Sequence, residues 1–241
     1  MIRLGRATWM FAIVTTLALC GCGGVGSVRT ASGNAASTRV DTTGVTRVEV
    51  ADGFDVKLAL GRPELAVVTY DDNLSDLLDV RVEGSTLRVR LKPHGLLGNP
   101  KLRADVTVQR LESIHTAGGA SVTTTATVQN SGLQLALSGG SRITAAVSVD
   151  RMSATLSGAS RATLTGMASA LTADASGASD LALAELRLHD LDVQLSGASH
   201  AEVQVDDTVA ADLSGASVLT YRGNPRFIKR ETSGASTIQG E

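Results

Sequence analysis

The tetrapeptide Ser-Gly-Ala-Ser occurs five times in the second half of this chain, at residues 157–160, 176–179, 196–199, 214–217 and 233–236. Two looser copies precede it, Ser-Gly-Gly-Ser at 138–141 and Gly-Gly-Ala-Ser at 118–121. Successive copies begin 20, 19, 19, 20, 18 and 19 residues apart. A short motif that returns at a nearly fixed period is typical of a solenoid, in which each repeat forms one coil and stacks on its neighbours.

Apolar residues alternate with polar ones inside each repeat. In the repeat 196–213 the apolar residues occupy every second position in two segments, first at Ala201, Val203 and Val205 and then at Val209, Ala211 and Leu213. One corner separates the two segments. Segments with period two are strands that bury one face. Two or three such strands per repeat predict a parallel β-helix with 18–20-residue coils over residues 116–241, with columns of aliphatic side chains inside.

Residues 39–115 alternate in the same way but lack the repeat. A hairpin is expected to join 80–82 to 87–91 through the turn Glu83-Gly84-Ser85. The segment 93–100 holds two Gly and two Pro and is expected to be a loop. No helix longer than a turn or two is needed, so the fold class is all-β, with an N-terminal β-rich segment before the β-helix.

The repeated motif is interpreted as a corner of the coil. Glycine reaches backbone angles that other residues avoid, and small side chains let successive corners stack. The corner glycines are Gly139, Gly158, Gly177, Gly197, Gly215 and Gly234. A catalytic serine would need a base within hydrogen-bond reach. The chain has four histidines, of which His200 alone directly follows a Ser-Gly-Ala-Ser corner, so we favour a structural role for the serines.

The residues that follow the corners are expected to form a stripe on the outside of successive coils, made of Arg142, Arg161, Asp180 and His200. This stripe could bind an acidic glycan, or it could simply solvate the surface and pair Arg161 with Asp180. We favour the second interpretation, because exposed charge pairs usually contribute little. The stripe lacks the repeated Asp of Ca²⁺-binding β-rolls, and no metal or cofactor site is expected.

The N-terminus resembles a bacterial lipoprotein signal, assigned to residues 1–21. Arg3 and Arg6 precede an apolar run of eleven residues, 9–19, which suits a signal peptide and is too short to span a bilayer. Cys22 follows a small residue, as a lipobox requires, and this resemblance implies its lipidation; the alternative is an ordinary secretory signal. Residues 22–38 are mainly Gly, Ala, Ser and Thr and are expected to form a flexible, lipid-anchored tether.

The run of Ser-Gly-Ala-Ser corners resembles the bacterial GIN-domain family, described as auto-transporter adhesin heads. The strand Phe54-Asp55-Val56-Lys57-Leu58, the turn Asp72-Asn73-Leu74 and the segment Tyr221-Arg222-Gly223-Asn224-Pro225 also match, and the similarity covers about residues 45–240. The resemblance implies a right-handed β-helix on an exported, often lipid-anchored protein. It supplies no catalytic residue, cofactor or ligand.

These observations predict a non-enzymatic lipoprotein of the bacterial cell envelope, anchored through Cys22 in the outer membrane or at the cell surface. Its β-helix would bind an envelope glycan or protein. The near-neutral formal charge of −2 favours neither nucleic acid nor an anionic bilayer as partner. The alternative is a β-helical polysaccharide lyase or hydrolase, for which Asp190/Asp192 and Asp206/Asp207 are the best acidic pairs.

Overall fold

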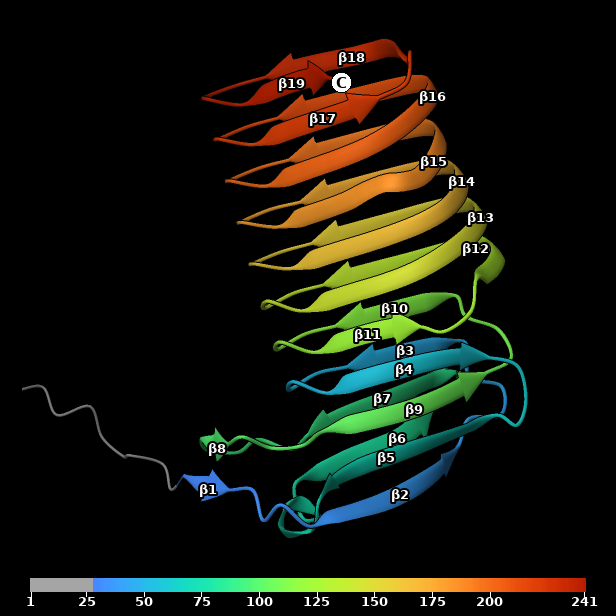
Figure 1. Ribbon diagram of the computed structural model, residues 1–241, viewed down its shortest axis with the longest axis vertical. Coiled ribbons are helices and arrows are strands. Elements are labelled where there is room, and N and C mark those ends of the chain that lie inside the picture. Colours follow the sequence, from blue (N-terminus) through green and yellow to red (C-terminus); the bar gives the residue numbers. More distant parts are fainter. Residues whose placement is uncertain (1–27) are drawn as a thin grey trace, which may run out of the picture.

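The computed structural model describes residues 28–241, which are almost entirely β-structure (Figure 1). The helical element in this part of the chain is the short 3₁₀ turn η1 (Asp72–Leu74). The strands are β1 (Arg29–Thr30), β2 (Ala35–Asp41), β3 (Arg47–Val50), β4 (Asp55–Leu60), β5 (Leu65–Asp71), β6 (Leu78–Glu83), β7 (Thr86–Leu91), β8 (Leu97–Gly98), β9 (Arg103–Val108), β10 (Ser113–Thr116), β11 (Ser121–Thr124), β12 (Val128–Leu137), β13 (Arg142–Leu156), β14 (Arg161–Ala175), β15 (Asp180–Leu195), β16 (His200–Leu213), β17 (Val218–Arg222), β18 (Arg226–Thr232) and β19 (Thr237–Gly240).

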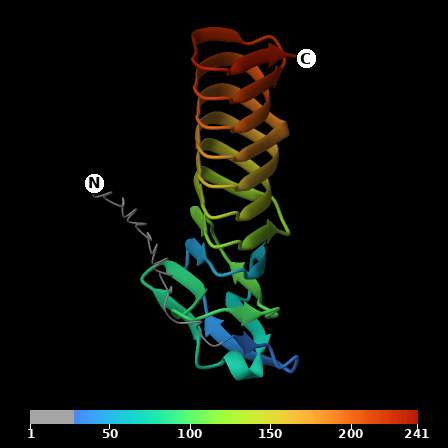
Figure 2. The ribbon, with the colours of Figure 1, turned by 90° about the vertical axis from the view of Figure 1, so that its left-hand side faces the viewer.

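The second half of the chain is the β-helix that the repeat predicts. Each long strand leaves one corner, bends round the opposite edge and reaches the next corner, and it pairs in parallel with the strand of the next coil. Arg142 lies beside Arg161, Arg161 beside Asp180, and Asp180 beside His200, so the repeat and the coil coincide. Figure 2, which looks onto the corner side, shows the coils stacked in one column above the N-terminal strands.

Each coil presents two faces. We call the surface formed by strand segments that precede a corner, together with β7 paired beneath them, the pre-corner face; it contains β7, β3, β10, the second halves of β12–β16 and β18. The surface formed by segments that follow a corner, together with β9 paired beneath them, is the post-corner face; it contains β9, β4, β11, the first halves of β13–β16, β17 and β19. The corners lie one above another at the left of Figure 1.

The N-terminal segment belongs to the same stack. β3 pairs in parallel with both β10 and β7, and β4 pairs in parallel with both β11 and β9. The coil formed by β3 and β4 therefore lies between strands that come later in the sequence. The predicted boundary between 115 and 116 falls inside β10, and the stack continues through it. Antiparallel strands β5 and β2 lie at the N-terminal end, and the expected hairpin is present as β6–β7.

The prediction of a flexible tether ending at residue 38 is wrong for its last part. Residues 35–38 lie in β2, which pairs with β5, and Arg29–Thr30 pairs with Leu97–Gly98 inside the expected loop. Backbone pairing at a sheet edge does not require an apolar pattern, so the polar composition of this segment concealed its strands. Residues 22–27, including Cys22, lie outside the described residues.

The first repeat is also longer than its motif suggested. Ser121 pairs with Arg142, so the residues equivalent to the corner 138–141 are 117–120 rather than 118–121. This coil takes 21 residues, outside the expected 18–20. The additional residues lie between Thr123 and Val128, where pairing to the next coil is interrupted.

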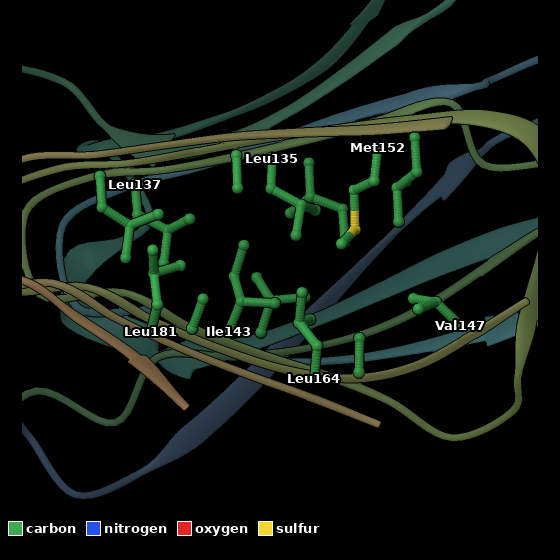
Figure 3. Close-up of a cluster of buried hydrophobic side chains, with 14 of the residues drawn as sticks. Leu135, Leu137, Ile143, Val147, Met152, Leu164 and Leu181 are labelled. Atoms are coloured by element: carbon green, nitrogen blue, oxygen red, sulfur yellow. The ribbon is translucent and has the colours of Figure 1, made fainter. Parts of the chain in front are cut away.

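The core is a set of aliphatic columns between the two faces (Figure 3). Leu135 and Met152 come from the pre-corner side and meet Ile143, Leu164 and Leu181 from the post-corner side. All of these side chains are buried. Large and small residues alternate up one column, as Ile143, Ala162, Leu181, Ala201 and Leu219. This alternation fills the narrow interior of these coils with aliphatic side chains, whereas the buried aromatic residue Phe54 lies lower in the stack, just before β4. Each buried leucine contributes about 1.5–3 kcal/mol.

Candidate functional site

The corner glycines form a column in which each corner touches the one before it. Gly177 has φ +78°, and a Cβ placed on it would lie 2.6 Å from the carbonyl oxygen of Gly158. The same oxygen accepts a 2.7 Å hydrogen bond from the Ala178 N–H. Positive φ and contact with the preceding corner both favour glycine at this position. The same pattern continues at the last three corner glycines, Gly197, Gly215 and Gly234.

The last serine of the corner closes the turn from inside. Ser160 is 1% exposed, and its hydroxyl donates a 2.8 Å hydrogen bond to the carbonyl of Ser157. The equivalent bond is made by Ser141, Ser179, Ser199 and Ser217. The hydroxyl protons of these serines are therefore used by the backbone of the corner, which is a structural role.

The residues of the expected stripe lie one above another on the post-corner face. Arg161 Nε lies 2.8 Å from Asp180 Oδ2, and this arginine side chain is 55% exposed. Below Arg142 the column continues through Ser121 and then Asp55. An exposed ion pair of this kind contributes less than about 1 kcal/mol.

The two acidic pairs occupy different surfaces. Asp190 lies on the pre-corner face, where it accepts a hydrogen bond from the Thr208 hydroxyl. Asp206 and Asp207 lie at the bend opposite the corners. There Arg187 is 3.2 Å from Asp206, and His189 Nε2 is 3.8 Å from Asp207. No group of three or more potential metal ligands occurs among residues 28–241.

Two of the hollows on the pre-corner face bring together residues that the sequence did not single out. The first has a volume of 460 Å³ and a floor of small side chains, including Ala51, Ala117 and Ala136. The second has a volume of 480 Å³ and contains Arg47, Arg110 and Arg151. These arginines are far apart in the sequence, and the insertion of β3 between β7 and β10 places them together, so no local motif could have revealed the second hollow.

The charges bordering the first hollow are paired. Arg88 lies 2.8 Å from Glu49 and 2.6 Å from Glu83, and Arg90 lies 2.8 Å from Asp79. Burial acts to raise the pKa of Asp79, but hydrogen bonds from Arg90 and Arg81 together outweigh it and hold this pKa below its usual value of 3.8. This border therefore carries little uncompensated charge.

Comparison with known families assigns the fold. Residues 44–225 match the family described as "Putative auto-transporter adhesin, head GIN domain". The chain belongs to the GIN-domain family. The match begins just before β3 and ends before β18, so the inserted N-terminal coil is part of the GIN domain. None of the curated proteins compared with the chain matches it.

Solved structures show the same architecture. A putative adhesin from Bacteroides fragilis is 15% identical, with a TM-score of 0.82 over 88% of this chain and 99% of that one. A putative adhesin from Parabacteroides merdae is 13% identical, with a TM-score of 0.71 over 89% and 99%. A putative lipid binding protein from Parabacteroides distasonis is 15% identical, with a TM-score of 0.72 over 89% and 100%. At these identities the likeness shows the GIN-domain fold.

Proposed function

We propose that this GIN-domain protein is an exported, lipid-anchored protein of the bacterial cell envelope and that its β-helix is a non-enzymatic surface for binding or adhesion. The observation that carries this proposal is the family match, because it covers the coils from β3 to β17 and the family is described as an adhesin head. The lipobox-like sequence before Cys22 supports the anchor.

The geometry suits display of a surface. The strand pairing links β7 to β18 through eight strand spacings, which at about 4.8 Å each give a stack about 40 Å long. The chain between Cys22 and β1 spans at most about 25 Å. A lipid at Cys22 would therefore hold the N-terminal end of the stack near the membrane and leave the distal coils accessible. No helix among residues 28–241 is long and apolar enough to cross a membrane.

The anchor is tested by changing Cys22→Ser in the full-length protein and separating membranes from soluble material. We expect the parent to sediment with membranes and the variant to be released, because each buried acyl methylene contributes about 0.8 kcal/mol to anchoring. Cys20→Ser is the matched control and is expected to stay with the membranes. A Cys22→Ser variant that fractionates like the parent would contradict the lipoprotein proposal.

A further inference from the structure

The second hollow of the pre-corner face, which we call the arginine groove, crosses five successive coils, from that of β3 to that of β14. Arg47 in β3 heads a column of paired positions that continues through Ser113, Gln134 and Ser153. Arg151 lies two residues before Ser153 in β13, and the column continues from Ser153 to Thr172. The backbones of Arg47 and Ser153 are three strand spacings apart, about 14 Å. Arg47 and Arg151 therefore line the hollow from strands that are three spacings apart.

The groove has an excess of positive charge. Its lining holds three arginines and one carboxylate, that of Glu112. Arg110 Nε lies 3.4 Å from Glu112, whereas no carboxylate in the described part of the chain lies within 4 Å of Arg47 or Arg151. Both of these arginines are exposed. Asp150 and Asp190 line the adjoining hollow beyond Arg151, so the positive region ends there.

Most of the other lining residues are small or polar, and the two aliphatic ones, Leu133 and Met152, are buried in the core beneath them. Gly132 lies between the arginines, where the absent side chain opens the floor. Hydroxyl and amide groups surround it, from Ser113, Asn130, Ser131, Gln134, Ser153 and Thr172. Ser131, Gln134, Ser153 and Thr172 are exposed and can exchange hydrogen bonds with sugar hydroxyls. Ser113 is buried, and the Asn130 amide is already bonded to the Leu111 carbonyl and to Arg110. No aromatic side chain lines the groove, so a nucleobase would find no stacking partner.

We propose that the arginine groove binds an acidic polysaccharide, with Arg47 and Arg151 each holding one anionic group of the chain and the polar floor holding its hydroxyls. Guanidinium groups donate paired hydrogen bonds to carboxylate and sulfate alike, so either group satisfies the site. The spacing of the arginines favours a polymer with repeated charges over a single small anion. This inference rests on the proposed function and names the ligand class of its surface.

The test uses the full-length protein purified in detergent and immobilised. Polygalacturonate supplies carboxylates, heparin supplies sulfates and dextran is the neutral polymer. We expect the parent to bind at least one of the two acidic polymers, more weakly as salt is added, and not dextran. Binding of polygalacturonate alone or heparin alone identifies the anionic group. Failure to bind either acidic polymer, or equal binding of dextran, would overturn the proposal.

The matched variants are Arg47→Ala and Arg151→Ala in the groove and Arg142→Ala on the post-corner face. Arg142 is also exposed, so its removal changes the net charge equally. We expect each groove variant to lose about tenfold in affinity, and Arg142→Ala to keep the parent affinity. Arg47→Lys keeps the charge and is expected to bind better than Arg47→Ala but more weakly than the parent. This intermediate affinity would show that Arg47→Ala loses binding through the missing contact and not through misfolding. Equal losses for Arg142→Ala and Arg47→Ala would refute the groove.

The double variant Arg47→Ala/Arg151→Ala separates this inference from the proposed function. Envelope extract is passed over parent and variant, and retained material is measured. If the parent retains material and the double variant retains as much, the proposal that the arginine groove binds the ligand is wrong, whereas the proposed binding function of the β-helix is still supported. If the parent itself retains nothing, the proposed function fails.

Discussion

At the scale of single residues, the corner glycines are not equivalent. Gly158 and Gly177 have nearly the same backbone, with φ of +76° and +78°. A Cβ on Gly158 would lie 3.2 Å from the amide nitrogen of Gly139, whereas a Cβ on Gly177 would lie 2.6 Å from a carbonyl oxygen. The preceding corners explain the difference, because 138–141 contains two left-handed glycines, Gly139 and Gly140, and 157–160 contains one.

We therefore predict that Gly177→Ala destabilises the protein more than Gly158→Ala. Both substitutions place a side chain at positive φ, which costs about 1 kcal/mol. In Gly177→Ala the new Cβ also clashes with the carbonyl oxygen of Gly158, and this clash can be relieved only by moving the backbone of one coil. The substitution should therefore lower the free energy of unfolding by about 2–4 kcal/mol in total. Denaturant unfolding of the two variants measures the difference. Equal costs, or a larger cost at Gly158, would contradict the carbonyl contact.

At the scale of elements, the hairpin β6–β7 depends on charge pairing. β6 pairs with β7 alone among the described strands, and Asp79 is 12% exposed at its side chain, bonded to Arg81 and Arg90. The carboxylate is stabilised in the fold, since its pKa is below the usual value. The contribution of Asp79 is present above its unfolded-state pKa and is lost as the pH falls through its lower folded-state pKa.

We predict that Asp79→Asn lowers the free energy of unfolding at neutral pH by about 1 kcal/mol. The gap between parent and variant should close as the pH falls through the lowered folded-state pKa of Asp79, because the parent carboxyl then loses its charge and resembles the neutral amide of the variant. Melting temperatures at a series of pH values measure this gap. Asp192→Asn, on an exposed strand position, serves as the control and should show little effect at any pH. A gap for Asp79→Asn that persists at low pH would refute the ionic contribution.

The elements also show what sequence could predict. From Arg142 onward each coil is formed by one continuous segment of the sequence. Residues one repeat apart in the sequence therefore pair in the structure, and these coils could be predicted from the repeat spacing. The coil of β3 and β4 carries the same alternation, but its neighbours β7, β9, β10 and β11 are set by pairing across the chain. The arginine groove depends on that insertion. Its residue types are ordinary, and only the register brings them together.

At the scale of the whole molecule, the C-terminal end of the stack differs from the central coils because aromatic and charged side chains cover it. The Arg230 guanidinium lies 5.1 Å from the centre of the Phe227 ring and donates a 3.1 Å hydrogen bond to the Ile238 carbonyl. Phe227 in turn packs edge-to-face on Tyr221, with ring centres 5.2 Å apart. The last coil thus places the aromatic residues over the aliphatic columns and a charge over the aromatics. Charged side chains at an exposed strand edge also discourage pairing with other chains.

A stack in which each coil contacts only its neighbours should respond to damage according to its position. Gly177 and Gly234 test this, because their local environments match: φ is +78° and +70°, and a Cβ would lie 2.6 and 2.5 Å from the carbonyl oxygen of the preceding corner. Gly177 also supports the corner of Gly197 above it, whereas Gly234 belongs to the last corner of the described stack.

We expect Gly177→Val to lower the melting temperature more than Gly234→Val, because the central substitution weakens two interfaces between coils and the terminal one weakens a single interface. Hydrogen exchange should locate the damage. In Gly234→Val the loss of protection should be confined to β18 and β19, while in Gly177→Val it should extend over β14, β15 and β16. Equal melting shifts, with loss of protection throughout the stack in both variants, would mean that the coils unfold as one cooperative unit rather than as neighbours.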